Sequence, residues 1–468
     1  MKVDVVKQDH EFEFSYPIVI VGGGGCGLTA ALAASDSALE VLVLEQDRSL
    51  MGTTAMSTGL IPAAGTAEQK ANGIVDSPEV FANDIQAKSD NGADPEVVNT
   101  LAKESAETIS WLQEKHNIPL SLVGGFLYPG HSQQRMYGSP NRTGGELMAA
   151  LENACSANGV DVLTEALVED LIVDAEQQVL GVRISRPDGS SEEIGCGALI
   201  LACCGFAGNI EMVAKYTPEM TEATFHGHPG NKGHAIKWGE AMGAELQDMS
   251  AYQGHGGLAH GYGIPILWPL IVEGGFQVNK LGQRFSDESK GYSEQAAKVL
   301  DQPDGVAWSI FDQRLYDLMM DFEDFREAVN AGAIVTAESI ELLSQKTKLD
   351  FDALNQTMSD VVDCVGGIKA DQFGRDFTQK PILQAPFYAA RVTGALFHTQ
   401  GGLAVNSQAR VLDKQGNAFP NLFAGGGAAR GISGSGASGY IAGNGLLTAV
   451  GLGKIAGRTA ATQVNESA

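Results

Sequence analysis

The stretch of residues 16–46 limits most strongly the folds that this chain can adopt. It reads YPIVIVGGGGCGLTAALAASDSALEVLVLEQ, an apolar strand, a glycine turn, a helix of small residues and a second apolar strand. Gly22, Gly24 and Gly27 give the spacing GxGxxG, and Glu45 ends the second strand. Strand, turn, helix and terminal acid together form the pattern of a unit that binds a dinucleotide.

The chemistry of a dinucleotide explains why these residue types stand at these positions. Gly22 allows the tight turn, and Gly24 lets a pyrophosphate approach the backbone. Gly27 lets the helix pack closely against the strand, and the first N–H groups of that helix hold the phosphates. Glu45 is placed to accept hydrogen bonds from ribose hydroxyls. We therefore predict an α/β fold with a Rossmann-like nucleotide-binding domain.

Composition excludes several classes of partner. The chain of 468 residues carries 57 acidic residues against 31 Lys and Arg, a net charge of −26. Nucleic acid and anionic membranes need basic surface, so neither is expected as a partner. The six cysteines show no ligand spacing, so no metal site is expected. A charged N-terminus and the lack of an apolar run of membrane length predict a cytoplasmic protein without a membrane span.

The order of motifs along the chain predicts two domains. Residues 410–430 read as a hairpin, a proline turn and a short strand running into glycines, and a helix follows from about Asn444. Residues 251–385 mix strands with helical stretches such as DFREAVNAGA, which indicates an inserted α+β domain. The first domain is therefore expected to comprise residues 1–250 and 386–468.

Four blocks resemble one family. They are VIVGGGGCGLTAALAA with Glu45, MGTTAMSTGLIP (51–62), GGFQVNKLGQRFSDES (274–289) and FHTQGGLAVNSQARVLDKQGNAFPNLFAGGGAA (397–429). Together they resemble the fumarate reductase/succinate dehydrogenase flavoprotein superfamily, which includes the 3-ketosteroid dehydrogenases. The resemblance implies FAD as the dinucleotide and identifies residues 251–385 with a capping domain that closes a substrate cleft over the flavin.

The same resemblance implies which residues bind FAD. The second block has no histidine at the place where respiratory members attach their flavin, so we expect non-covalent FAD. Gly427 replaces an acid that relatives use to hold flavin hydroxyls. The expected FAD contacts are Gly22, Gly24, Gly25, Gly27, Glu45, Gln46, Thr53, Thr54, Ser57, Gly59, Val168, Gly205, Gly426, Gly443, Leu446 and Leu447.

Two tyrosines decide which flavin chemistry is expected. Fumarate-type enzymes carry an arginine acid four residues after the Glu of an RF-x-x-E motif and a second arginine just before a C-terminal Gly-Asn pair. Tyr292 and Tyr440 occupy these places here.

The ketosteroid dehydrogenases resemble this chain in an E-S-x-x-Y motif, here Glu288 to Tyr292. In them one tyrosine removes the proton alpha to a ketone, a second binds the ketone oxygen, and flavin N5 takes the beta hydride. A tyrosine serves as base only when its surroundings tune it, and the developing enolate needs an oxyanion hole.

Several further residues are candidates for the site. Tyr128 or Tyr137 is expected to assist the base, and the sequence does not choose between them. His398 is as consistent with substrate binding as with packing beside the flavin. Arg142 and Arg391 would serve an acidic substrate, although ion pairing is the simpler role for each. Gly443 and Asn444 are expected to border the substrate.

The predicted function is an FAD-dependent desaturase of a cyclic ketone, either a 3-ketosteroid or a smaller oxocyclohexane such as 4-oxocyclohexanecarboxylate. The alternative is a fumarate-reductase-like enzyme for a small unsaturated carboxylate. A flavin protein that only transfers electrons is the third possibility. The substrate is a small molecule, and the sequence identifies neither the electron acceptor nor the oligomeric state.

Overall fold

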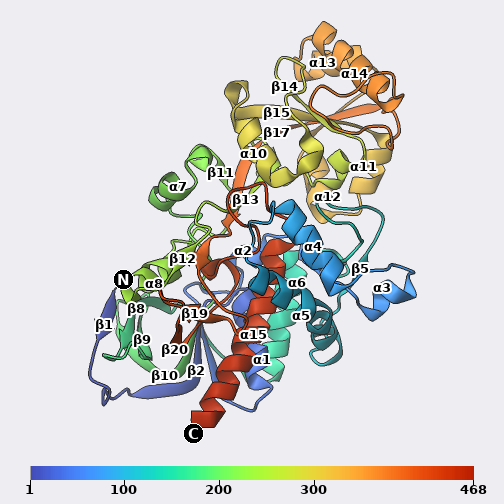
Figure 1. Ribbon diagram of the computed structural model, residues 1–468. Coiled ribbons are helices and arrows are strands. Elements are labelled where there is room, and N and C mark those ends of the chain that lie inside the picture. The colour runs from blue at the N-terminus through green and yellow to red at the C-terminus, as the bar shows by residue number, and fades with distance from the viewer. Residues whose placement is uncertain (1, 468) are drawn as a thin grey trace.

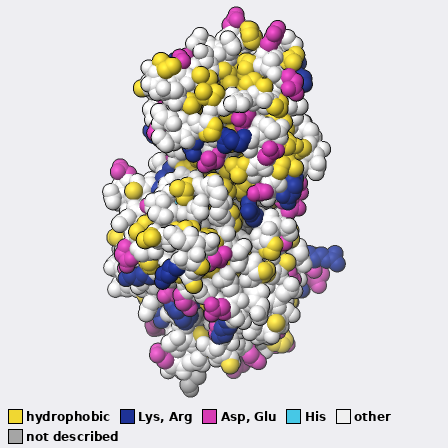
Figure 2. Space-filling view, turned by 90° about the vertical axis from the view of Figure 1, so that its right-hand side faces the viewer, with side chains coloured by type: hydrophobic (Ala, Val, Ile, Leu, Met, Phe, Trp, Pro, Cys, Tyr) yellow, Lys and Arg dark blue, Asp and Glu magenta, His cyan; other side chains and the backbone are white. Residues whose placement is uncertain are grey.

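Two β-sheets organise the protein, each in its own lobe. The computed structural model describes residues 2–467, and Figure 1 shows the lobe that contains both termini below a second lobe built from the middle of the chain. The two lobes meet at a narrower waist, along which hydrophobic side chains are visible in Figure 2.

A nine-stranded sheet forms the first lobe. Its strands run in the order β1-β8-β9-β10-β2-β3-β7, and β20 pairs with both β10 and β19. β2 pairs in parallel with β3 and β10, and its last four residues are fully buried. Burial on both faces is typical of parallel strands covered by helices. The bounds are β1 Val3–Val5, β2 Phe14–Val21, β3 Val41–Leu44, β7 Asp161–Leu163, β8 Leu167–Val173, β9 Val179–Ser185, β10 Ser191–Leu201, β19 Arg410–Leu412 and β20 Ala418–Ala424. The predicted α/β class and Rossmann-like domain are confirmed.

The first and last long helices pack against each other through small residues. A Cβ added at Gly27 of α1 would lie 1.8 Å from the Gly22 carbonyl oxygen. One added at Gly457 of α15 would lie 2.1 Å from the Ala30 carbonyl oxygen. Glycine at these positions therefore allows α1 to approach both the turn before it and α15. The helices of this lobe are α1 Gly25–Ser35, α2 Gly52–Ala55, α3 Ala67–Ala71, α4 Pro78–Lys88, α5 Pro95–Glu114, α6 Gly144–Ala157, α7 Ile210–Tyr216, α8 His234–Met242 and α15 Asn444–Ser467.

A six-stranded sheet forms the second lobe. β17 pairs with four strands, β11, β13, β15 and β16, and β15 also pairs with β14. β17 spans Phe387–Thr399 and carries the chain back toward the first lobe, so this sheet continues past residue 385, where the sequence placed the end of the inserted segment. The other strands are β11 Thr224–Phe225, β13 Tyr252–Ala259, β14 Phe276–Asn279, β15 Val306–Asp312 and β16 Ile334–Ala337. The helices are α9 Pro269–Val272, α10 Tyr292–Leu300, α11 Gln313–Met319, α12 Glu323–Asn330, α13 Ile340–Thr347 and α14 Phe351–Val365.

Five short strands form two further small sheets. The additional strands are β4 Ile61–Pro62, β5 Ser121–Val123 and β6 Met136–Gly138 in one small sheet, and β12 Leu246–Gln247 and β18 Gly402–Leu403 in another. Over residues 2–467, no helix is long and apolar enough to cross a membrane.

Candidate active site

One deep cavity runs from the glycine turn after β2 to the underside of the second lobe. Its nucleotide end is lined by the carboxyl ends of β2 and β3, the block of residues 51–59 and the start of α15. Its other end is lined by residues of β13, α10, α12 and β17. The carboxyl edge of a doubly wound sheet is where such folds bind their ligands.

Most of the residues expected to bind FAD lie together around the nucleotide end. Those that line the cavity are Gly22, Gly24, Gly25, Glu45, Gln46, Thr53, Thr54, Ser57, Val168, Gly426, Gly443 and Leu446.

The other four expected FAD contacts, Gly27, Gly59, Gly205 and Leu447, lie behind this surface and do not line the cavity. Their local packing explains the difference. Added Cβ atoms would lie 2.7 Å from the Thr143 carbonyl oxygen at Gly59 and 2.1 Å from the Thr399 hydroxyl at Gly205. These glycines allow backbone segments to approach each other.

The start of α1 has the features that a pyrophosphate requires. Its N-cap residue is Gly24, no side chain caps it, and its first turn has no acidic residue. Such a helix start leaves N–H groups and a positive dipole end for an anion. Glu45 at the end of β3 accepts hydrogen bonds from the backbone N–H groups of Gly23 (2.8 Å) and Asp47 (3.0 Å). These bonds fix its carboxylate at the cavity wall, and the set of residues fits FAD.

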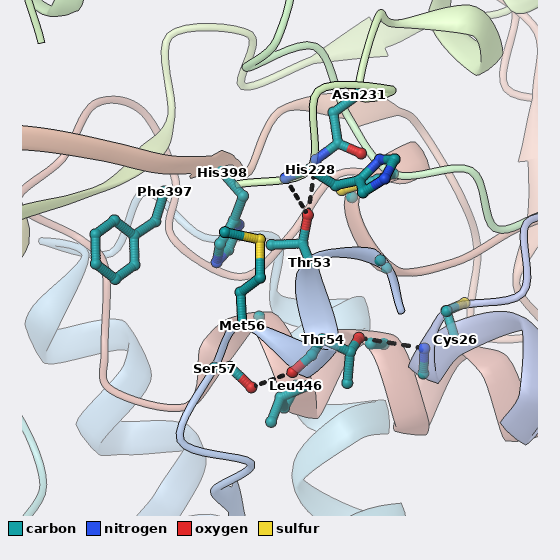
Figure 3. A pocket seen from close by; sticks show the side chains of 18 of the residues that line it. Cys26, Thr53, Thr54, Met56, Ser57, His228, Asn231, Phe397, His398 and Leu446 are labelled. Carbon is teal, nitrogen blue, oxygen red and sulfur yellow. Dashed lines mark hydrogen bonds between the residues drawn. The ribbon is translucent and has the colours of Figure 1, made fainter. Parts of the chain in front are cut away.

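Hydrogen bonds hold the block of residues 51–59 between two walls of the cavity (Figure 3). The Gly25 N–H donates to the Thr54 hydroxyl oxygen at 3.2 Å. On the opposite side, the Asn231 side-chain amide donates to the Thr53 hydroxyl oxygen at 2.8 Å. The Ser57 hydroxyl donates to the Thr54 carbonyl oxygen at 2.7 Å. The block is thus tied to α1 and to the loop that contains Asn231.

A row of aromatic rings lines the other end of the cavity. Phe397 and His255 stack with ring centroids 5.1 Å apart and an interplanar angle of 11°. His255 lies 5.1 Å from the ring of Tyr292, and Tyr292 lies 5.8 Å from Tyr440. The ring of Tyr440 is in turn 5.9 Å from His398. The row offers flat apolar surface to a ring-shaped ligand.

Tyr292 and Tyr440 are buried side chains whose hydroxyl groups interact. Burial raises the pKa of Tyr292 well above its usual value, and the neighbouring Tyr440 and Tyr128 raise it further. Burial also raises the pKa of Tyr440, while the Gly445 N–H and the Tyr292 hydroxyl lower it. That N–H donates to the Tyr440 hydroxyl oxygen at 3.5 Å. Both tyrosines are neutral hydrogen-bonding groups near pH 7.

His398 is a neutral group at the end of this row. Burial lowers the pKa of His398 to about 4. The Gln400 side-chain amide lies 2.8 Å from its Nδ1, and a Cβ added at Gly445 would lie 2.7 Å from its Nε2. Nδ1 also lies 3.4 Å from the Thr399 carbonyl oxygen, so the tautomer of the uncharged ring depends on which of these two partners Nδ1 bonds. Such a ring can donate a hydrogen bond to a carbonyl but lacks the charge to bind a carboxylate.

The cavity wall contains no lysine or arginine among the described residues. Arg142, an expected substrate contact, instead lies with its Nη1 3.8 Å from an Asp321 oxygen and its guanidinium 5.4 Å from the centre of the Phe322 ring. Arg391 is an exposed residue of β17. Neither arginine lines the cavity, which therefore has no cation for an acidic substrate.

The structure also separates the two tyrosines that the sequence left open. Tyr128 lines the cavity. Tyr137 lies in β6, outside the cavity wall, where its hydroxyl bonds to that of Thr66. Asn444, expected at the substrate, bonds through its amide to the Ser433 hydroxyl and does not line the cavity. Gly443 beside it does.

Sequence reasoning missed several residues of the wall. Gln253, Leu267, Trp268, Asp324 and Phe397 line the cavity. His255, in the glycine-rich segment HGGLAHGYG, is only 3% exposed and stands in the aromatic row. The dense glycines of β13 were a usable signal, because they bring this strand under α10. Added Cβ atoms at Gly254 and Gly256 would lie 2.6 and 2.8 Å from Ser293 and Gln295.

The glycine turn, the uncapped helix start and the fixed acid at the end of β3 define a protein that binds a dinucleotide at the edge of its sheet. The chain belongs to the FAD binding domain family, whose model matches residues 17–446. It is an FAD-dependent oxidoreductase, and the superfamily and cofactor predicted from the sequence are confirmed.

Comparisons with known proteins agree with this assignment. A probable fumarate reductase of Shewanella frigidimarina (strain NCIMB 400) is 30% identical over 448 residues, which cover 95% of this chain and 74% of that protein. The open conformation of a flavocytochrome c3 fumarate reductase matches with a TM-score of 0.80 and 28% identity over 97% of this chain and 79% of that one. The 3-ketosteroid-Δ4-(5α)-dehydrogenase from Rhodococcus jostii RHA1, in complex with 4-androstene-3,17-dione, matches with a TM-score of 0.77 and 23% identity, covering 98% of this chain and 100% of that one. At that identity the last comparison shows a common fold only.

Proposed function

We propose that this protein is an FAD-dependent dehydrogenase that introduces a C=C bond next to the carbonyl group of a cyclic ketone. One observation carries the proposal. At the end of the cavity beneath the second lobe, the hydroxyl groups of Tyr292 and Tyr440 meet two neutral histidines, and the charged side chain of this end is an acid, Asp324, with no lysine or arginine in the described wall. A neutral carbonyl matches such a wall, whereas a carboxylate would be desolvated without a partner.

The two tyrosines have different neighbours and therefore different proposed roles. Tyr440 receives the Gly445 N–H, so its own O–H can point at a ketone oxygen and polarise it beside the ring of His398. Tyr292 lies edge to face with Tyr440 and receives the alpha proton. Proton removal and carbonyl polarisation at adjacent positions are what formation of an enolate requires. FAD, when bound, supplies the acceptor for the beta hydride.

The aromatic row supports a ring-shaped substrate. Stacked Phe397 and His255 and the edge of Trp268 present flat surfaces on one side of the cavity. Leu60, Leu267 and Met136 add apolar walls. A 3-ketosteroid and a smaller oxocyclohexane both have the required ring and carbonyl. An oxocyclohexanecarboxylate fits less well because its acid group would meet no cation in this wall.

A second candidate is a reductase of a small unsaturated carboxylate. The 30% identity to a probable fumarate reductase favours it. The tyrosines at 292 and 440, in place of the two family arginines, weigh against it. Under this alternative a carboxylate must bind through His398, whose pKa is lowered to about 4 by burial and which is therefore uncharged near pH 7.

An anaerobic screen separates these candidates. The FAD-loaded enzyme is mixed with 4-androstene-3,17-dione, with 4-phenylcyclohexanone and with succinate, and the flavin absorbance is followed. Bleaching by a ketone and not by succinate is expected. Reoxidation of dithionite-reduced enzyme by fumarate, without any response to ketones, would overturn the proposal in favour of the second candidate. No response to either class would favour a protein that only transfers electrons.

We also propose that FAD is bound without a covalent link, since the block of residues 51–59 contains no histidine. Acid precipitation should release all of the flavin into the supernatant. Flavin fluorescence that stays with the precipitated protein would contradict this. The electron acceptor is a further small molecule or protein. The screen does not require it, because a single anaerobic turnover is enough to bleach the flavin.

A further inference from the structure

Asp324 is a carboxylate in the cavity wall that the proposed reaction leaves without a role. It lies in the first turn of α12 (Glu323–Asn330) in the second lobe, is half-buried and lines the same cavity as the tyrosine pair. No hydrogen bond or ion pair reaches its side chain from any residue between 2 and 467. A partly desolvated carboxylate without a partner is costly, and such groups cluster at binding sites.

The position of Asp324 is fixed by contacts between the two lobes. Phe322 stands two residues before Asp324, and its ring centroid lies 5.8 Å from that of Phe126. The Arg142 guanidinium lies 5.4 Å from the centre of the same Phe322 ring. Phe126 contacts Tyr128 edge to face at 5.1 Å. The start of α12 is therefore packed onto the loop that supplies Tyr128.

Asp324, Tyr128 and the tyrosine pair line the same cavity. Burial raises the pKa of Tyr128, the Arg142 guanidinium lowers it and the charge of Asp324 raises it. Burial likewise raises the pKa of Tyr292, and Tyr128 adds to that shift. Tyr128 thus stands within electrostatic reach of both. Because these residues line one cavity, a ligand whose carbonyl lies at the Tyr292–Tyr440 pair can place its far end near Asp324.

Stabilisation of the start of α12 does not explain why the Asp324 side chain lines the cavity. Acidic residues in a first turn stabilise a helix through its dipole. Glu323, the residue before it, is exposed and already supplies such a charge without lining the cavity. The orientation of Asp324 into the cavity is therefore not needed for the helix.

We propose that Asp324 determines substrate specificity by accepting a hydrogen bond from a hydroxyl group on the end of the ligand that lies away from the ketone. An ionised carboxylate has only acceptor sites, so it favours a hydroxyl and disfavours a carbonyl or a carboxylate at that end. The substrate class is then a hydroxylated cyclic ketone. This inference rests on the proposed function, since it assumes that the carbonyl occupies the tyrosine pair.

Two matched pairs of ketones test it. In each pair one member has a distal hydroxyl and the other lacks it. The pairs are 17β-hydroxy-4-androsten-3-one with 4-androstene-3,17-dione, and 4-(4-hydroxyphenyl)cyclohexanone with 4-phenylcyclohexanone. Dissociation constants are measured from the change in flavin absorbance of the FAD-loaded enzyme. Where a pair of ketones binds, we expect the hydroxylated member to bind about tenfold more tightly than the member that lacks the hydroxyl.

The variant Asp324→Asn and its matched control Glu323→Gln complete the test. Both remove one negative charge from the first turn of α12, but only the first changes the cavity wall. The preference should fall to twofold or less in Asp324→Asn and stay near tenfold in Glu323→Gln. Loss in both variants would assign the effect to the charge of the helix start and overturn the inference, as would a preference that Asp324→Asn retains.

The outcomes also separate this inference from the proposed function. If ketones bind and bleach the flavin without any preference for the hydroxyl, the function stands and the role of Asp324 is wrong. If neither pair perturbs the flavin while fumarate reoxidises the reduced enzyme, the ketone function is wrong and the inference falls with it.

Discussion

Tyr292 and Tyr440 lie edge to face with their ring centroids 5.8 Å apart, although one begins a helix of the second lobe and the other precedes the last helix of the first. Both side chains line the cavity, one from each lobe. In the proposed reaction this contact places the tyrosine that removes the proton next to the tyrosine that polarises the carbonyl. It also makes the reaction depend on how the two lobes are held together.

Removing the Tyr292 hydroxyl should abolish proton transfer and leave the cofactor bound. Tyr292→Phe keeps the ring in the aromatic row and deletes only the proposed base. Flavin reduction by a ketone should slow by a factor of about 10² to 10⁴. The rate is measured by anaerobic stopped-flow absorbance, and the flavin content by the absorbance of the desalted protein.

Tyr316→Phe is the control, because Tyr316 packs on Tyr388 at 4.8 Å in the second lobe and does not line the cavity. It should reduce its flavin at the wild-type rate. A Tyr292→Phe enzyme that reacts at the wild-type rate would remove Tyr292 from the mechanism.

Tyr128 and Tyr137 should respond differently to the same substitution. Tyr128→Phe is expected to slow flavin reduction about tenfold or more, because its hydroxyl lies in the cavity wall near the base. Tyr137→Phe deletes a buried hydrogen bond to Thr66 and should lower the free energy of unfolding by about 1–2 kcal/mol without slowing the reaction. Urea unfolding and stopped-flow rates on both variants distinguish the roles. A slower reaction in Tyr137→Phe at unchanged stability would reverse the assignment.

The fold and the nucleotide end could be predicted from the sequence because their signals are local. The glycine spacing, the helix start and Glu45 lie within one short stretch, and close backbone packing leaves a readable pattern of glycines. Tyr292 and Tyr440 could be found only by their positions in family motifs. Asp324 and Trp268 gave no signal, since only the packing of the second lobe on the first brings them to the cavity. The choice between Tyr128 and Tyr137 depended on which side chain of a small sheet faces inward, which their spacing does not fix.

Substitution of two glycines of the motif should distinguish a glycine needed for packing from one needed for FAD binding. A Cβ at Gly27 would lie 1.8 Å from the Gly22 carbonyl oxygen, so Gly27→Ala should destabilise the apoprotein by about 1–3 kcal/mol or more. A Cβ at Gly24 meets no atom closer than 3.9 Å, and its φ of −78° suits alanine. Gly24→Ala should therefore leave the apoprotein stable and weaken FAD binding about tenfold or more, because the methyl group occupies the approach of the pyrophosphate. Thermal unfolding of apoprotein and titration with FAD measure the two effects. Equal losses of stability in both variants would contradict the separation.

The ion pairs before α10 should stabilise the second lobe and hold the base in place. The buried Glu288 carboxylate accepts from Arg284 at 2.9 Å and from Arg375 at 2.8 Å. Its backbone carbonyl accepts from the Trp268 indole at 3.2 Å. Glu288→Gln leaves the buried Arg375 guanidinium without its counter-ion and leaves Arg284 with Asp371 as its one acidic partner, and should cost about 3–5 kcal/mol in the free energy of unfolding.

The exposed pair of Lys280 and Asp304 provides the control for this prediction. Their side chains are 45% and 63% exposed, so Asp304→Asn should change stability by less than about 1 kcal/mol. Both variants are compared by urea titration of the FAD-loaded protein. Similar stability of the two would show that the buried network contributes no more than a surface pair.

The rate of flavin reduction should rise with pH across the neutral and alkaline range. The proposed base acts as a phenolate, and burial together with Tyr440 and Tyr128 raises the pKa of Tyr292 well above 10. Below its pKa the ionised fraction grows tenfold for each pH unit, so the rate should increase steadily between pH 7 and 9.5 without a plateau. Burial lowers the pKa of His398 to about 4 and that of His255 to about 3, so both rings stay neutral and add no step near pH 6.5. Tyr440→Phe removes one cause of the raised pKa of Tyr292, so its slower rate should begin to level off at a lower pH. Stopped-flow rates of the wild type and Tyr440→Phe across this range measure both effects, and a wild-type plateau reached below pH 8 would point to a histidine base instead.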